Sequence, residues 1–166
     1  MKKNLLLLLL AAVFTMISCD NNEKQPLSPE EQFVQDLMKQ SKDFDAENLV
    51  QSLPGVWDLD AKFRYDAKYK NVTDVIVFEG QAYWDGGASY TYTFNANGKG
   101  ECTMYTCEND STYSFDWHYD AESSKLILSG DYNMQRVVSG FNGEYLILDN
   151  STTNSNLREV YKRRVE

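Results

Sequence analysis

Apolar and polar residues alternate with a period of two through most of the chain after Gly55. The clearest run is residues 113–119, where Tyr, Phe, Trp and Tyr alternate with Ser, Asp and His. Successive side chains of a strand point to opposite faces of a sheet, so this period predicts strands with one buried and one solvated face. The predicted strands cover residues 57–65, 75–78, 90–94, 101–106, 113–119, 125–129, 132–138, 144–148 and 157–164.

Short turn sequences separate these strands. Asn97-Gly98 and Asn142-Gly143 favour tight hairpins, and residues 120–123 and 129–131 are rich in Asp, Ser and Gly. Eight or nine short strands joined mainly by hairpins predict an all-β fold, either an antiparallel up-and-down barrel or a flattened sandwich. In the first strand one apolar face is predicted to carry Trp57, Leu59, Ala61, Phe63 and Tyr65.

One or two short helices are predicted before the first strand. Ser28 can cap the first helix, with Pro29 at its first position and Glu31 placed to complete a capping box. A second short helix is expected to begin at Asp45 and to end before Pro54-Gly55.

The first 19 residues have the form of an export signal. Lys2 and Lys3 precede the apolar stretch 5–17, which ends in Met-Ile-Ser-Cys19, a sequence that resembles a bacterial lipobox. The resemblance implies that Cys19 receives diacylglycerol and becomes the first residue of a lipoprotein held in a membrane by several acyl chains. A cleaved secretory signal with an incidental Cys19, or an uncleaved anchor, are the alternatives.

The expected organisation follows from these features. Residues 1–18 form the lipoprotein signal peptide, 19–27 a flexible polar tether, 28–53 a helical segment and 54–166 the β-barrel domain. The expected location is extracytoplasmic, lipid-anchored to the bacterial outer membrane, on either the periplasmic or the outer side.

Charge and residue content exclude several functions. The net charge is −9 before the loss of Lys2 and Lys3, so nucleic acid is not an expected partner. His118 is the single His, and it lies on the polar face of its predicted strand without a recognisable nucleophile motif. We therefore expect neither enzymatic activity, nor a cofactor, nor a metal site.

Cys102 and Cys107 leave two states open. An even pair of cysteines in an oxidising compartment indicates a disulfide. If residues 102–107 formed one extended strand, however, the two Cα atoms would lie about 16 Å apart, too far for a bridge. A disulfide would therefore need a turn or bulge between the two residues.

The motif Gly55-Val56-Trp57 opens the first strand and resembles the Gly-x-Trp signature of lipocalin-type proteins. The hairpin Tyr92 to Gly98 and the closing segment Arg158 to Arg163 are similar to the lipocalin-like domains of short bacterial lipoproteins. The resemblance covers residues 53–164. It implies that Trp57 plugs the closed end of a barrel and that a basic residue of the last strand, here Arg158, packs across its ring.

The leading functional hypothesis is a non-enzymatic barrel that binds a small apolar or amphipathic ligand. The alternative is a module that contacts a glycan or a protein through its outer face, which the excess of Tyr also permits. Tyr83-Trp84 precedes a flexible Asp-Gly-Gly turn, where one of the two rings would face solvent or a cavity mouth. The candidate ligand contacts are Tyr83, Trp84, Tyr113, Phe115 and Trp117.

Overall fold

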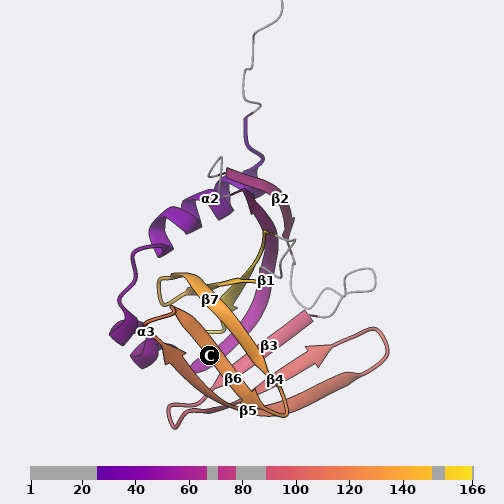
Figure 1. Cartoon of the computed structure of the whole chain (residues 1–166). Helices are drawn as coiled ribbons and strands as arrows, with labels where there is room; N and C mark the ends of the chain where they lie inside the picture. Colours follow the sequence, from indigo (N-terminus) through magenta and orange to yellow (C-terminus); the bar gives the residue numbers. More distant parts are fainter. Residues whose placement is uncertain (1–25, 67–70, 78–88, 151–155, 166) are drawn as a thin grey trace, which may run out of the picture.

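The structure is a computed structural model that describes residues 26–66, 71–77, 89–150 and 156–165. In the described part of the chain, two helices precede nine strands, and Figure 1 shows how they are arranged. The helices are α2 (Pro29–Ser41) and α3 (Ala46–Ser52). The strands are β1 (Gly55–Asp66), β2 (Asn71–Val77), β3 (Ser89–Phe94), β4 (Lys99–Tyr105), β5 (Asp110–Asp120), β6 (Lys125–Gly130), β7 (Met134–Phe141), β8 (Tyr145–Asp149) and β9 (Leu157–Arg163).

Eight antiparallel strands close into an up-and-down barrel. From β3 to β9 each strand pairs with the next along the chain, and β1 pairs with β3 on one edge and with β9 on the other. The remaining strand, β2, pairs with the second half of β1, beyond the end of β3. The prediction of an all-β barrel behind two short helices is confirmed, and the pairing of β1 with β9 distinguishes a barrel from a sandwich.

The helix signals in the sequence work as expected. The Ser28 hydroxyl accepts the backbone N–H of Glu31 at 3.1 Å, and the Glu31 carboxylate accepts the N–H of Ser28 at 2.8 Å. This reciprocal pair is the predicted capping box. The Asp45 carboxylate likewise accepts the N–H of Asn48 at 2.9 Å at the start of α3.

The prediction of one continuous apolar face on β1 is wrong. The register against β9 pairs Leu59 with Tyr161 but Ala61 with Val160, so β1 carries one extra residue at Asp60. A β-bulge of this kind reverses which face the following residues present. Trp57 and Leu59, before Asp60, therefore face the barrel interior, whereas Ala61 and Phe63 belong to a separate cluster outside it.

That outer cluster is where α2 packs (Figure 1). Val34 and Leu37 of the helix are 0% and 4% exposed, so the amphipathic helix α2 buries these two residues of its apolar stripe against the barrel. Phe33, beside them, makes an edge-to-face contact with Tyr145 at 5.8 Å between ring centroids. The buried members are Val34, Leu37, Ala61, Phe63, Val72, Tyr145, Ile147 and Val160.

The larger core lines the barrel interior and includes Leu49 of α3 and Leu53, which caps the C-terminal end of that helix. Leu49 and Leu53 of the α3 segment are completely buried against Trp57, so this helix covers one end of the barrel. The buried members from the strands are Trp57, Leu59, Tyr92, Phe94, Cys102, Phe115, Trp117, Leu126, Leu128, Met134, Val138, Phe141, Leu146, Leu148 and Tyr161.

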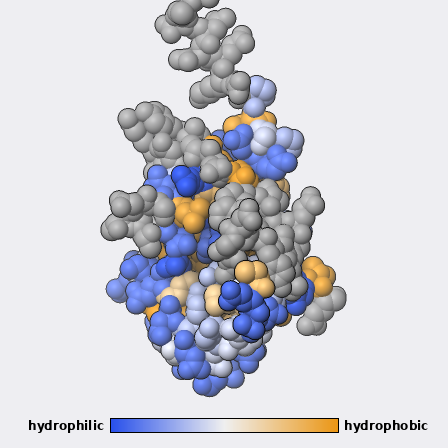
Figure 2. Space-filling model, turned by 90° about the vertical axis from the view of Figure 1, so that its right-hand side faces the viewer, coloured by the Kyte–Doolittle hydropathy of each residue, from blue (hydrophilic) through white to orange (hydrophobic). Residues whose placement is uncertain are grey.

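One face of the described part is mainly hydrophilic. On the face in Figure 2, hydrophilic residues cover most of the lower barrel and hydrophobic residues form small separate patches. Among the described residues, no helix is both long enough and apolar enough to cross a membrane.

Candidate functional site

The end of the barrel beneath α3 is closed by Trp57. Its indole N–H donates to the Leu53 carbonyl at 2.8 Å, and its ring is completely buried. The guanidinium of Arg163 lies over the ring, with its Cζ atom 5.2 Å from the ring centroid, and it donates a hydrogen bond to the Pro54 carbonyl. Gly55 has a φ of +146°, and a Cβ there would lie 2.8 Å from Nη2 of Arg163. The glycine of the Gly-x-Trp motif thus leaves room for the arginine that covers the tryptophan.

The basic partner of Trp57 is therefore Arg163, and the expectation that Arg158 fills this role is wrong. The reason is register, because Trp57 pairs with Arg163 while Arg158 pairs with Phe63, beyond the bulge. Arg158 stacks on Tyr65 at 4.2 Å and forms an ion pair with Asp149 at 3.8 Å. Burial lowers the pKa of Arg158.

Away from Trp57 the inner wall becomes polar. We call Lys62, Tyr90, Arg136, Asn150 and Glu159 the inner polar cluster. The bulge at Asp60 explains the presence of Lys62, since it turns this residue to the same side as its cross-strand partner Glu159. Tyr90 lies on the inner face of β3, and the Lys62 ammonium is 5.8 Å from its ring.

Glu159 is the centre of this cluster. It is only 6% exposed, and its carboxylate accepts the Tyr161 hydroxyl at 3.0 Å and the Asn150 side-chain N–H at 3.3 Å. The Lys62 ammonium completes the set at 3.6 Å. A buried carboxylate is tolerated when it is paired and hydrogen-bonded in this way. Burial and then Glu159 raise the pKa of Tyr161 well above its ordinary value, so this hydroxyl stays protonated.

Arg136 reaches the interior from β7. It lies between Met134 and Val138, two inward-facing core residues, and it pairs across the sheet with Leu126, which is completely buried. Its Nε atom is buried and has no hydrogen-bond partner among the described residues, while Nη1 donates to the carbonyl of Gln135 at 3.2 Å. A buried polar atom without a partner is costly, which marks this guanidinium as a group open to a ligand.

A set of hydroxyl and sulfur atoms lies between the polar cluster and the apolar core. The hydroxyls of Tyr92 and Tyr132 are 3.0 Å apart, and that of Tyr92 donates to Met134 Sδ at 3.4 Å. Burial raises the pKa of Cys102, which lies beside these hydroxyls, to about 12. At neutral pH Cys102 is therefore a thiol and not a nucleophilic thiolate.

The disulfide alternative for Cys102 and Cys107 does not hold in the structure, where both are free thiols. Cys102 points into the barrel from β4 and is completely buried, whereas Cys107 is exposed in the turn between β4 and β5. β4 ends at Tyr105, so the two cysteines do not belong to one extended strand, and the turn that contains Cys107 does not bring the two thiols into a bridge.

The other predicted ligand contacts lie in different surroundings. Phe115 and Trp117 are core residues, 3% and 9% exposed, and the Trp117 indole donates to the Asn95 carbonyl at 3.0 Å. Tyr113 is half-buried, and its ring centroid lies 6.3 Å from that of Tyr132. Tyr83 and Trp84 lie outside the described residues. A ligand-binding role for all five residues stays a prediction.

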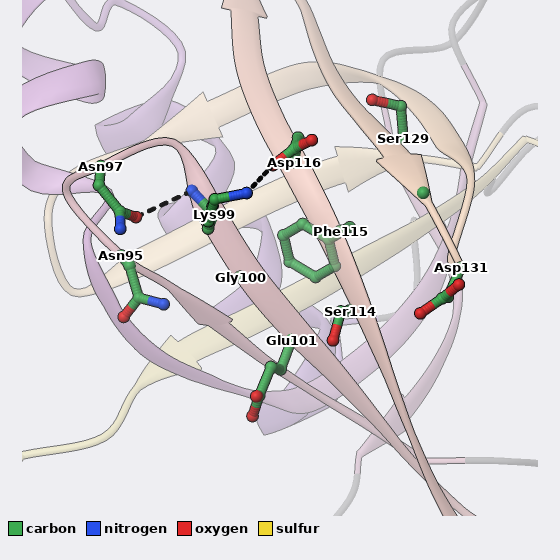
Figure 3. Close-up of a pocket in the computed structure, with 11 residues that line it drawn as sticks. Asn95, Asn97, Lys99, Gly100, Glu101, Ser114, Phe115, Asp116, Ser129 and Asp131 are labelled. Carbon is green, nitrogen blue, oxygen red and sulfur yellow. Dashed lines mark hydrogen bonds and ion pairs between the residues drawn. The ribbon is translucent and has the colours of Figure 1, made fainter.

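A groove of about 390 Å³ crosses the outer wall over β4, β5 and the end of β6 (Figure 3). Lys99 lies between its partners there, with its backbone N–H donating to Asn97 and its ammonium paired with Asp116, both at 3.1 Å. The other lining residues are Asn95, Gly100, Glu101, Ser114, Phe115, Ser129, Gly130 and Asp131. The groove is polar and open, in contrast to the enclosed inner cluster.

His118 is exposed on the outer side of β5, away from Cys102 in the interior. Within the described residues, no group of three or more His, Cys, Asp or Glu side chains could hold a metal ion.

Comparisons with known proteins add little to this description. No protein-family model matches the sequence, and no curated protein matches it. Among solved structures, the chain is similar to insecticyanin from the tobacco hornworm Manduca sexta, with a TM-score of 0.40 and 12% sequence identity. The match covers 74% of this chain and 63% of that one. The class of the protein therefore comes from its topology, a closed up-and-down barrel of eight antiparallel strands.

Proposed function

We propose that this chain is a lipocalin-like lipoprotein that binds a small amphipathic ligand inside its barrel and catalyses no reaction on it. The observation that carries the proposal is the change along the barrel interior from an apolar end to a polar one. Trp57 and the residues around it form the apolar end. The inner polar cluster lines the other half of the barrel interior. Ligand sites of this class combine an apolar wall with a few placed polar groups.

The polar groups are difficult to explain by folding alone. Burying Lys62 and Glu159 costs desolvation that well-packed apolar residues would avoid, and such a pair adds little net stability. A barrel of eight strands can fill its interior with side chains or hold one small ligand. The buried Nε of Arg136, which has no hydrogen-bond partner within the described residues, favours the second alternative.

Binding can be tested with a neutral fluorescent probe such as N-phenyl-1-naphthylamine. Energy transfer from Trp57 and Trp117, which line the interior, would report the probe only when it lies close to them. We expect saturable transfer that Leu128→Trp abolishes, because a larger ring there fills the interior. Ile127→Trp, on the outer side of the same strand, is the matched control. Absence of saturable transfer would contradict the proposal.

Attachment to a membrane is the second part of the proposal, and it rests on the lipobox at Cys19. We expect Cys19→Ala to abolish labelling by a fatty-acid analogue, since that thiol is the acylation site. The matched control is Cys107→Ala, which removes an exposed thiol and should leave the labelling unchanged. Label retained in Cys19→Ala would contradict lipidation.

The outer groove favours a second candidate function, contact with a glycan at the cell surface. Its carboxylates, amides and hydroxyls can all hydrogen-bond to sugar hydroxyls. Glu101→Ala and Asp131→Ala would each weaken binding to a glycan array if this function holds, without changing transfer to the interior probe.

A further inference from the structure

We infer that the inner polar cluster selects ligands with an acidic headgroup, a carboxylate or a phosphate, which binds to the guanidinium of Arg136. The inference rests on the proposed function, because it names the ligand class of the same interior. It follows from three features of the cluster. Arg136 has an N–H donor without a partner within the described residues, Glu159 is already hydrogen-bonded and ion-paired, and an apolar wall lies beside them.

Arg136 has unused hydrogen-bonding capacity. A guanidinium carries five N–H donors in a planar fork that matches a carboxylate or a phosphate. Of these, Nη1 donates to the Gln135 carbonyl, and buried Nε has no partner within the described residues. An acidic group would accept from Nε and an adjacent Nη atom together, which is the strong bidentate arrangement.

Glu159, the carboxylate already in the cluster, is bonded to other residues of the cluster. Glu159 accepts from Tyr161 and Asn150 and is paired with Lys62, so each of its oxygens already has a partner. Two cations, Lys62 and Arg136, thus share the cluster with one carboxylate. Burial and Glu159 raise the pKa of the Tyr90 hydroxyl. The positive charge of Arg136 acts on the same hydroxyl and lowers its pKa by a smaller amount. A ligand anion would balance the second positive charge.

The surroundings of Arg136 indicate what the acidic group is attached to. Met134, Val138 and Leu126 are the neighbours of Arg136 on the inner face of β6 and β7, and all three are buried. An acid with an apolar body can therefore place its chain or ring on this wall while its head reaches Arg136. The net charge of the whole chain is −9, so the preference for an anion must come from this local site and not from the outer surface.

The experiment compares ligands that share one chain and differ in the head. The full chain is placed in nanodiscs of zwitterionic phosphatidylcholine, and the naphthylamine probe is displaced by decanoate, decyl phosphate, methyl decanoate or decyltrimethylammonium, with protein-free nanodiscs as the blank. We expect the two acids to displace the probe at concentrations at least about tenfold lower than the ester or the cation. The ratio between decanoate and decyl phosphate tells which acid is preferred.

Variants then locate the effect. Arg136→Gln should weaken displacement by the preferred acid about 10- to 100-fold, the usual range for losing a hydrogen bond to a charged group, and leave the ester within about twofold. Arg136→Lys keeps the charge and should retain part of the preference. Lys99→Gln, which removes one positive charge from the outer wall, is the matched control and should change nothing.

The possible results distinguish a failure of this inference from a failure of the proposed function on which it rests. Equal displacement by decanoate and methyl decanoate, or an acid preference that survives in Arg136→Gln, overturns the inference while ligand binding stands. Failure of the probe to bind at all overturns the proposed function and the inference with it. Acid preference lost in Arg136→Gln and kept in Lys99→Gln supports both.

Discussion

Replacement of Trp57 by Ala should destabilise the barrel by about 3–5 kcal/mol, the range for emptying a large aromatic site in a core. The structure supports the upper part of that range. The ring is completely buried, its N–H satisfies the Leu53 carbonyl at 2.8 Å, and the Arg163 guanidinium covers its face. The variant leaves a cavity, an unpaired carbonyl and a cation without its aromatic partner.

Trp57→Phe separates these contributions. It keeps most of the apolar ring but leaves the Leu53 carbonyl without its donor, which should cost about 1–3 kcal/mol. Urea unfolding followed by circular dichroism measures both variants, and Phe33→Ala, whose ring is 43% exposed on α2, is the aromatic control. A loss below about 1 kcal/mol for Trp57→Ala would show that the ring does not close the barrel as described.

Three further predictions concern the same core. Gly55→Ala should lower the free energy of unfolding by about 1–3 kcal/mol, because it strains the backbone and clashes with Arg163. The loss should be smaller in an Arg163→Ala background, where the clash is absent. Equal losses in urea melts of the two backgrounds would contradict the clash. Stability should decrease as pH rises from about 10 to 12, because unfolded tyrosines ionise near pH 10 whereas burial raises the pKa of folded Tyr132 to about 12. Tyr132→Phe should make that decrease shallower in melts across this range, and an unchanged slope would contradict the pKa assignment. In the native protein a thiol reagent should modify Cys107 but reach Cys102 only after unfolding, as measured by mass spectrometry; modification of neither thiol without a reductant would indicate a disulfide instead.

Local chemistry was enough to predict the elements and the fold class. The capping box at Ser28, the turn at Asn97-Gly98 and the alternation in residues 113–119 each depend on neighbours within a few residues. Hairpins joining successive strands then leave few arrangements other than a meander, which closes to remove its two edges. For this reason the all-β barrel and its two preceding helices could be read from the sequence.

The candidate site depended on contacts that no local pattern encodes. The bulge at Asp60 is set by the pairing of β1 with β9, about 100 residues later, and it alone decides that Lys62 faces inward. The same register selects Arg163 over Arg158 as the partner of Trp57. The period of two places Arg136 on the same face as Met134 and Val138, but only the structure shows that its buried Nε has no hydrogen-bond partner within the described residues.

The sequence by itself determined which segments become helices and strands, because those choices depend on short-range propensity, capping and turn geometry. Only the tertiary structure decided which side chains meet inside the barrel. A shift of one residue in strand register moves every later side chain to the opposite face, and that register is set by the closed sheet as a whole. The inner polar cluster, drawn from β1, β3, β7, β9 and the segment after β8, exists only once the barrel is closed.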